Sequence, residues 1–143
     1  MKINLISREH SLLAVFQTHD TDLVWLLTHD IAHWLVLRQP MDAVPIDGGW
    51  SRLSSRVSSL LHDRCGHSDA RYATAEIRAC AVQWALLAAI GVRRFSRSDT
   101  YGRIAQGTNL GHTGFERVEE YARRPRVQQY AAAFTRWLDA RTP

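Results

Sequence analysis

The chain has 143 residues, a size typical of one domain, and 45% of them are hydrophobic, which is enough for a single core. Eight glycines and four prolines argue against a disordered or fibrous chain. Seventeen arginines and one lysine against fourteen acidic residues give a formal net charge of +4. Without a long basic run, this charge permits an acidic protein or nucleic-acid partner but does not favour direct nucleic-acid binding.

The predicted secondary structure is helical along almost the whole chain. Serine, threonine or aspartate residues stand where helices would begin, and proline or glycine residues stand where they would end. The predicted helices cover residues 7–17, 20 or 21 to about 38, 51 to about 64, 69–92, 113 to about 123, and 125 to at least 138. Loops are predicted over Gln39–Trp50, which contains two prolines and a Gly pair, and over the polar segment Arg93–His112.

Two of these helices carry clear local signals. Residues 69–92 are rich in alanine and leucine, with Asp69 near the start and Gly91 at the end. The sequence TGFE fits a capping box, in which Thr113 and Glu116 cap each other's backbone amides. Since the chain contains no internal repeat and no linker, the predicted fold is one all-α domain of about five to six helices over residues 1–143.

The expected location is the cytoplasm. The amino-terminal sequence MKINLISREH lacks the long apolar run and small-residue cleavage site of a signal peptide. The longest apolar run, Leu23–Leu37, is shorter than a membrane span and is interrupted by polar residues. Neither Cys65 nor Cys80 stands in a pattern that indicates a disulfide framework.

The most apolar predicted helix contains three polar side chains, His29, Asp30 and His33. Burying such a group without a partner costs about 1–3 kcal/mol, so another residue or a metal ion has to satisfy it. On a helix, residues four apart lie on one face with Cβ atoms about 5–6 Å apart, and two imidazoles so placed can chelate one divalent ion. The pattern H-D-x-x-H differs from the H-E-x-x-H of metal-binding helices in the shorter acid at Asp30.

Glu76 is the predicted third ligand. Its neighbours on the predicted helix are mostly Ala, Ile, Cys and Val, and an ionised carboxylate in such surroundings needs a cation or a strong hydrogen-bond donor. Two histidines and one carboxylate suit zinc, and equally suit the facial triad of non-haem iron enzymes.

A structural interpretation fits the same residues. The His/Asp/Glu cluster would then be a buried polar network that holds two helices in register. Asp30 would pair with an arginine, the candidates being Arg52, Arg56 and Arg78. The two interpretations differ in geometry, because metal ligands converge within about 3–4 Å of one another around an ion, whereas a network shows direct hydrogen bonds with no room for one.

Three segments of the chain, taken together, resemble a known family. They are HDIAHWLV (His29–Val36), IDGGW (Ile46–Trp50) and EIRACAVQWALLAAIG (Glu76–Gly91). The elongation factor P hydroxylase family has an H-E-x-x-H-W helix, an aromatic-containing Gly loop, and then a Glu followed eight residues later by Trp. Glu76 and Trp84 keep that last spacing.

The closing segment Phe115–Leu138 also resembles the last two helices of that family, although the chain before the histidines is shorter than in the family. Family members are iron-dependent enzymes that hydroxylate a modified lysine on a translation factor. The resemblance therefore implies iron as the cofactor, with zinc as the alternative, and implies His29, His33 and Glu76 as the metal ligands. Asp30 stands where the family has Glu, which implies either a further metal ligand or a base beside the metal. In its catalytic role it would orient a ligand or shuttle a proton.

Other candidate ligands are given simpler interpretations. His62, Cys65 and His67 lie close together in HDRCGH, but standard zinc signatures have two ligand pairs, so a polar loop with a free thiol is preferred. His112 is expected to be a solvated loop residue, and Cys80 to be packed within its helix as a small hydrophobic side chain.

Two arginine clusters are candidate partner-contact surfaces. They consist of Arg93, Arg94 and Arg97 in the polar loop, and of Arg123, Arg124 and Arg126 between the last two predicted helices. Each is explained either as a solvated loop or as a contact surface for an acidic partner or a phosphate backbone.

Two functions from different classes follow from the sequence. The first is a small metal-binding enzyme, an iron-dependent hydroxylase that acts on a protein side chain, with a zinc hydrolase as its variant. The second is a non-catalytic binding or inhibitor module that docks on a larger protein or nucleoprotein complex, with the His/Asp/Glu cluster structural. Serine-hydrolase, P-loop and Rossmann chemistry are disfavoured because their sequence motifs are absent.

Overall fold

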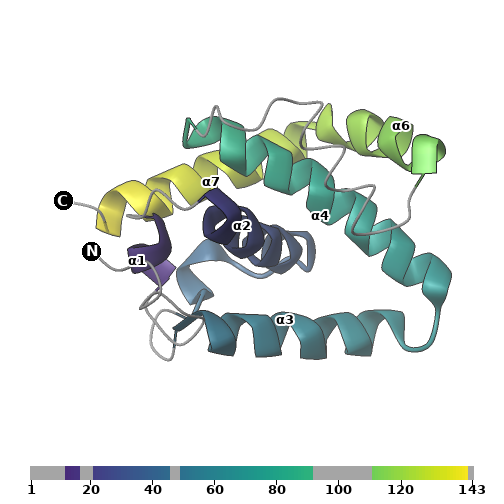
Figure 1. Ribbon diagram of the computed structural model, residues 1–143, viewed down its shortest axis with the longest axis horizontal. Helices are drawn as coiled ribbons and strands as arrows, with labels where there is room; N and C mark the ends of the chain where they lie inside the picture. Colours follow the sequence, from purple (N-terminus) through teal and green to yellow (C-terminus); the bar gives the residue numbers. More distant parts are fainter. Residues whose placement is uncertain (1–11, 17–20, 46–48, 92–110, 142–143) are drawn as a thin grey trace.

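The computed structural model describes residues 12–16, 21–45, 49–91 and 111–141, and these ranges contain no strand (Figure 1). The described residues form α1 (Leu12–Phe16), α2 (Thr21–Val36), the 3-10 helix η2 (Met41–Ala43), α3 (Gly49–Cys65), α4 (Asp69–Ala89), α6 (Gly111–Ala122) and α7 (Pro125–Arg141). The predicted all-α fold class is therefore confirmed. None of the described helices is long and apolar enough to cross a membrane.

Two predicted boundaries differ from those of the structure. Within the predicted 39–50 loop, the chain forms η2, and α3 begins at Gly49, so Trp50 is helical. Gly49 has φ 69°, a left-handed conformation that glycine adopts without steric cost. α6 begins at Gly111, so Thr113 lies inside the helix and is not the N-cap that the capping box predicted.

The helix α2 is bounded by ordinary start and stop signals. Asp22 in its first turn complements the positive end of the helix dipole. After Val36 the chain turns through Arg38, at φ 63°, and reaches Pro40, which cannot continue a helix. The indole Nε1 of Trp34 donates a hydrogen bond to the Pro40 carbonyl at 2.9 Å and so ties this turn to the helix.

The helices α2 and α4 pack against each other at the centre of the fold, and α4 also contacts α3, α6 and α7 (Figure 1). Trp25 of α2 contacts Gln83 of α4, whereas His33, two turns later, contacts Glu76, so the two helices run in opposite directions. Their shared face is apolar except for His29 and His33 of α2 and Glu76 and Gln83 of α4. The candidate site therefore lies at the most extensively packed helix pair of the molecule.

The hydrophobic core joins α2, α3, α4 and α7. Its largest buried side chains are aromatic: Trp34 from α2, Trp50 from α3 and Phe134 from α7. Fully burying a large apolar side chain stabilises a fold by about 1.5–3 kcal/mol, so Trp50 and Phe134 help to hold α3 and α7 in the core that they share with α2. The candidate site is built on this rigid part of the fold.

Candidate metal centre

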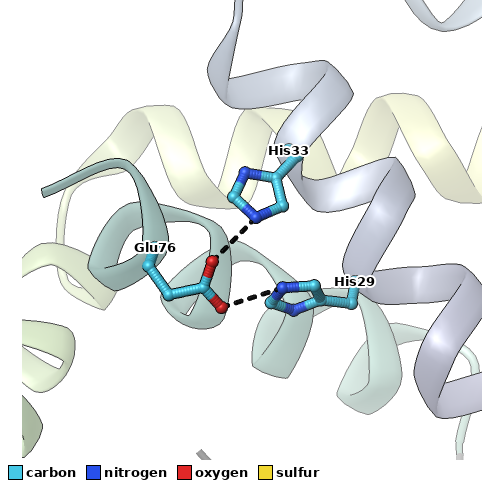
Figure 2. Close-up of side chains that lie close together, drawn as sticks. All are labelled: His29, His33 and Glu76. Carbon is cyan, nitrogen blue, oxygen red and sulfur yellow. Dashed lines mark hydrogen bonds and ion pairs between the residues drawn. The ribbon is translucent and has the colours of Figure 1, made fainter. Parts of the chain in front are cut away.

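The structure brings the three predicted ligands together. His29 and His33 project from successive turns of α2, and Glu76 reaches towards both from α4 (Figure 2). Glu76 Oε1 lies 2.9 Å from His29 Nε2, and Glu76 Oε2 lies 2.9 Å from His33 Nε2. One ligand atom from each residue lies within 4.8 Å of the other two. Among the described residues, these three form the group that could hold a metal ion.

These separations can be compared with what an ion requires. Two ligands at right angles, each about 2.1 Å from an ion, are about 3.0 Å apart, and tetrahedral ligands are about 3.4 Å apart. The two 2.9 Å nitrogen–oxygen separations end on different oxygens of Glu76 and are also ordinary hydrogen-bond distances, so they do not select a coordination geometry. The widest separation, up to 4.8 Å, exceeds the roughly 3.0 Å between the mutually adjacent ligands of a facial triad, so the side chains have to move together by more than about 1 Å to hold an ion.

The candidate centre is only partly covered by protein. The side chains of His29 and Glu76 keep 27% and 23% of their surface exposed, whereas His33 keeps only 6%. A metal ion at this position would be anchored from the buried side by His33 and would be reachable from solvent beside His29 and Glu76. Catalytic metal sites need such an open side, because water or substrate must reach the ion.

A fully buried amide fixes the orientation of His29. Gln83 Nε2 donates a hydrogen bond to the Trp25 carbonyl at 2.7 Å, so it is Gln83 Oε1 that faces His29 Nδ1, at 3.0 Å. A carbonyl oxygen only accepts hydrogen bonds, so His29 Nδ1 must carry a proton. Metal-binding histidines are held in the same way, with the ring nitrogen away from the metal donating to an oxygen.

The fixed proton on Nδ1 constrains the other nitrogen of His29. In neutral His29, Nε2 then has no proton, and its lone pair faces a carboxylate oxygen of Glu76 at 2.9 Å. This contact is favourable only when His29 is doubly protonated or when a cation is bound by both groups. With neutral His29 as the reference, the cluster therefore needs one additional positive charge, either a second proton on His29 or a bound cation.

The contacts within the cluster shift the pKa values of Glu76 and His29 in opposite directions. Burial disfavours the charged form of Glu76, but the hydrogen bonds from His29 and His33 outweigh this and hold the pKa of Glu76 well below its ordinary value of 4.5. Burial also opposes the charged form of His29, but the hydrogen bond and charge of Glu76, with smaller effects of Gln83 and Asp30, raise the pKa of His29 above its ordinary 6.5. Glu76 is therefore an anion that attracts either a proton or a metal ion.

The two histidines differ in their surroundings. His33 Nδ1 is buried and has no hydrogen-bond partner among the described residues, whereas His29 Nδ1 faces Gln83.

Cys80, one turn after Glu76, places its Sγ 3.7 Å from Glu76 Oε1. Burial and the charge of Glu76 raise the pKa of the Cys80 thiol, so it stays protonated and acts as a weak donor to Glu76, packed within its helix as predicted.

Asp30 faces a different helix. Its Oδ2 accepts hydrogen bonds from Trp50 Nε1 and from Ser54 Oγ, both at 2.6 Å, and both donors belong to α3. Asp30 is not a member of the converging ligand group, and it pairs with none of the three arginines suggested by the sequence. In the described part of the chain, it links α2 to α3.

Asp30→Ala is expected to destabilise the protein by about 2–3 kcal/mol, because it removes a charged acceptor of two hydrogen bonds. Asp30→Asn keeps an acceptor oxygen and should cost less. Urea unfolding measures both effects, and the metal content per folded protein should not change. A variant that keeps its stability but loses metal would instead return Asp30 to the predicted role beside the metal.

The remaining predicted residues lie away from the cluster. His62, Cys65 and His67, at the end of α3 and in the turn after it, form no converging ligand group. Arg123, Arg124 and Arg126 are exposed at the turn between α6 and α7. Arg93, Arg94 and Arg97 lie outside the described residues, as does the side chain of His112.

The sequence interpretation missed Gln83. It is a fully buried polar residue in the otherwise apolar Ala79–Leu87 run, seven residues after Glu76 and thus on the same helix face. Its position in an apolar run, on the same helix face as Glu76, could have indicated a role in the cluster, because a buried amide needs hydrogen-bond partners across the helix interface.

Comparison with known proteins adds no relative. No protein-family model matches the chain, and no curated protein or solved structure is significantly similar to it. The resemblance to the hydroxylase family therefore stays a prediction from the sequence segments quoted above.

Proposed function

We propose that this protein binds one divalent metal ion through His29, His33 and Glu76 and acts as an iron-dependent hydroxylase on a protein side chain. The observation that carries the metal proposal is the convergence of two imidazole nitrogens and one carboxylate, within 4.8 Å of one another, at the packed α2–α4 interface. Gln83 supports it by holding His29 with Nδ1 protonated and Nε2 directed at the position of the ion.

The choice of iron rests on ligand chemistry and on the resemblance in sequence. Two histidines and one carboxylate leave coordination positions open, and an iron ion held in this way supplies activation of oxygen, whereas zinc would supply an activated water. The exposed side of His29 and Glu76 is where a substrate side chain would approach.

The first test is the metal content of the untagged protein and of the double variant His29→Ala/His33→Ala. After anaerobic incubation with Fe²⁺ and, separately, with Zn²⁺, and removal of the excess, elemental analysis should give about one ion per wild-type chain and almost none per variant chain. Tighter retention of Zn²⁺ than of Fe²⁺ is expected of any such nitrogen and oxygen site and does not decide between them; oxygen consumption by the Fe²⁺-loaded protein would support the oxygenase, and activity with Zn²⁺ alone would shift the proposal to a hydrolase. Equal metal contents in both proteins would refute the site.

A non-catalytic binding module is the second candidate. The direct 2.9 Å contacts from both histidines to Glu76 are what a structural network would show. Under this interpretation a doubly protonated His29 supplies the required positive charge, and the cluster only holds α2 against α4. Wild-type protein without bound metal, whose double variant mainly loses thermal stability, would favour this candidate.

A further inference from the structure

A second polar pocket lies between α4 and α6, away from the candidate metal centre. It has a volume of about 200 Å³ and is lined by Thr74, Ile77, Arg78, Arg117, Glu120, Tyr121 and Arg124. Arg78 is two residues after Glu76, which corresponds to roughly 200° around the axis of α4. The pocket and the His/Glu cluster therefore lie on opposite sides of this helix.

Two of the pocket's three guanidinium groups are held by an aromatic ring. The Cζ atoms of Arg78 and Arg124 lie 5.6 and 5.1 Å from the centroid of the Tyr121 ring. Cation–π contacts of this kind attract a guanidinium to the face of the ring. Tyr121 is itself half-buried in the core side of α6, so the ring is a fixed support that brings arginines from two segments together.

Neighbouring acids offset only part of the positive charge of the pocket. In the part of the chain that the structure describes, Arg78, Arg117 and Arg124 have no carboxylate within 4 Å, since the ion pairs found there join Glu76 to histidines. Glu120 is the single acidic residue of the lining, so the seven residues carry a net charge of +2. Like charges gathered in one place repel one another, and an anionic ligand would relieve that repulsion.

The arginines and the size of the pocket define the class of anion. A guanidinium binds phosphate through two parallel hydrogen bonds, and several together suit a phosphate dianion better than a singly charged carboxylate. Pockets for whole drug-sized ligands occupy about 300–1,000 Å³, so the smaller space here suits one phosphate group rather than an entire cofactor.

We propose that the α4–α6 pocket binds a phosphate monoester through Arg78, Arg117 and Arg124. This inference does not depend on the metal proposal, because no residue is shared between the two sites. Arg124 belongs to one of the arginine clusters predicted from sequence, whereas Arg78 and Arg117 do not, so the pocket refines that prediction.

The test is a titration of isotope-labelled protein with inorganic phosphate at constant ionic strength, followed by amide and arginine side-chain chemical shifts. Saturable shifts confined to α4, α6 and the turn at Arg124 are expected. The variant Arg78→Gln/Arg124→Gln should bind at least tenfold more weakly. Arg56→Gln removes an exposed arginine of α3 and should bind as the wild type does.

A second variant keeps the test decisive even when the double variant does not fold. Glu120→Gln removes the one negative charge of the lining and should tighten phosphate binding several-fold; unchanged or weaker binding would overturn the proposal. Phosphoserine and adenosine monophosphate then distinguish a protein-borne from a nucleotide-borne phosphate. Equal weakening in Arg56→Gln, shifts spread over the whole surface, or binding of an RNA oligonucleotide without binding of phosphate would each refute the pocket.

Discussion

Replacing Glu76 by Gln is expected to weaken metal binding strongly and to leave the fold intact. Glutamine has the same shape, so its amide oxygen can accept from His33 Nε2 and its NH₂ group can donate to the unprotonated Nε2 of neutral His29. Both direct contacts of the cluster therefore persist without any charge, and stability should change by no more than about 1 kcal/mol. A neutral amide is a poor metal ligand, so affinity should fall on the order of 100-fold or more.

This substitution separates the metal centre from the structural network. Metal affinity is measured by competition with a chelator, and stability by urea unfolding of the metal-free protein. Glu120→Gln is the matched control, since it removes an exposed glutamate of α6 that lies outside the cluster. Retention of metal by Glu76→Gln would show that Glu76 is not a ligand, and a loss of several kcal/mol with no metal bound by the wild type would favour the structural network.

The sequence predicted the members of the cluster because two local rules apply to them. His29 and His33 are four residues apart on an apolar helix, and Glu76 is an isolated carboxylate within an apolar helical run. Each rule concerns one helix only. Neither rule predicts how the two helices pack. The structure places α2 and α4 antiparallel, with His29, His33 and Glu76 at the same level along the helix axes.

The same limit explains what the sequence did not predict. Asp30 lies next to His29 in sequence, but it points about 100° away around α2, and its partners depend on where α3 packs. The Pro and Gly residues before Trp50 predict a loop there, and a loop gives no indication that the indole N–H of Trp50 faces Asp30. Likewise, Arg78 and Arg124 are 46 residues apart, and only the packing of α6 on α4 places both beside Tyr121.

Gln83→Leu is expected to weaken metal binding about 10–100-fold, although Gln83 would not touch the ion. Without the amide oxygen, neutral His29 is free to place its proton on Nε2 and donate it to Glu76. The metal-free cluster then satisfies itself without a positive charge, and a metal ion has to displace that proton. Thr28→Val is the matched control, because Thr28 is equally buried in α2 but bonds only its own helix backbone.

The pH dependence of stability shows whether Gln83 acts through His29. In the metal-free wild type, the raised pKa of His29 stabilises the fold fully below 6.5, and this contribution is lost as pH rises through the raised value. The lowered pKa of Glu76 contributes above 4.5 and is lost as pH falls, so the cluster is most stabilising between about 4.5 and 6.5.

In Gln83→Leu the loss of stability above pH 6.5 should be smaller, because neutral His29 still donates to Glu76. Added metal should reverse the trend in the wild type, since an ion bound at Nε2 replaces the proton and binds more tightly as pH rises. Unfolding curves of both proteins from pH 5 to 8.5, with and without metal, measure these effects. Parallel pH profiles for the two proteins would mean that Gln83 only fills space, whereas a flatter profile together with weaker metal binding requires that it orient His29.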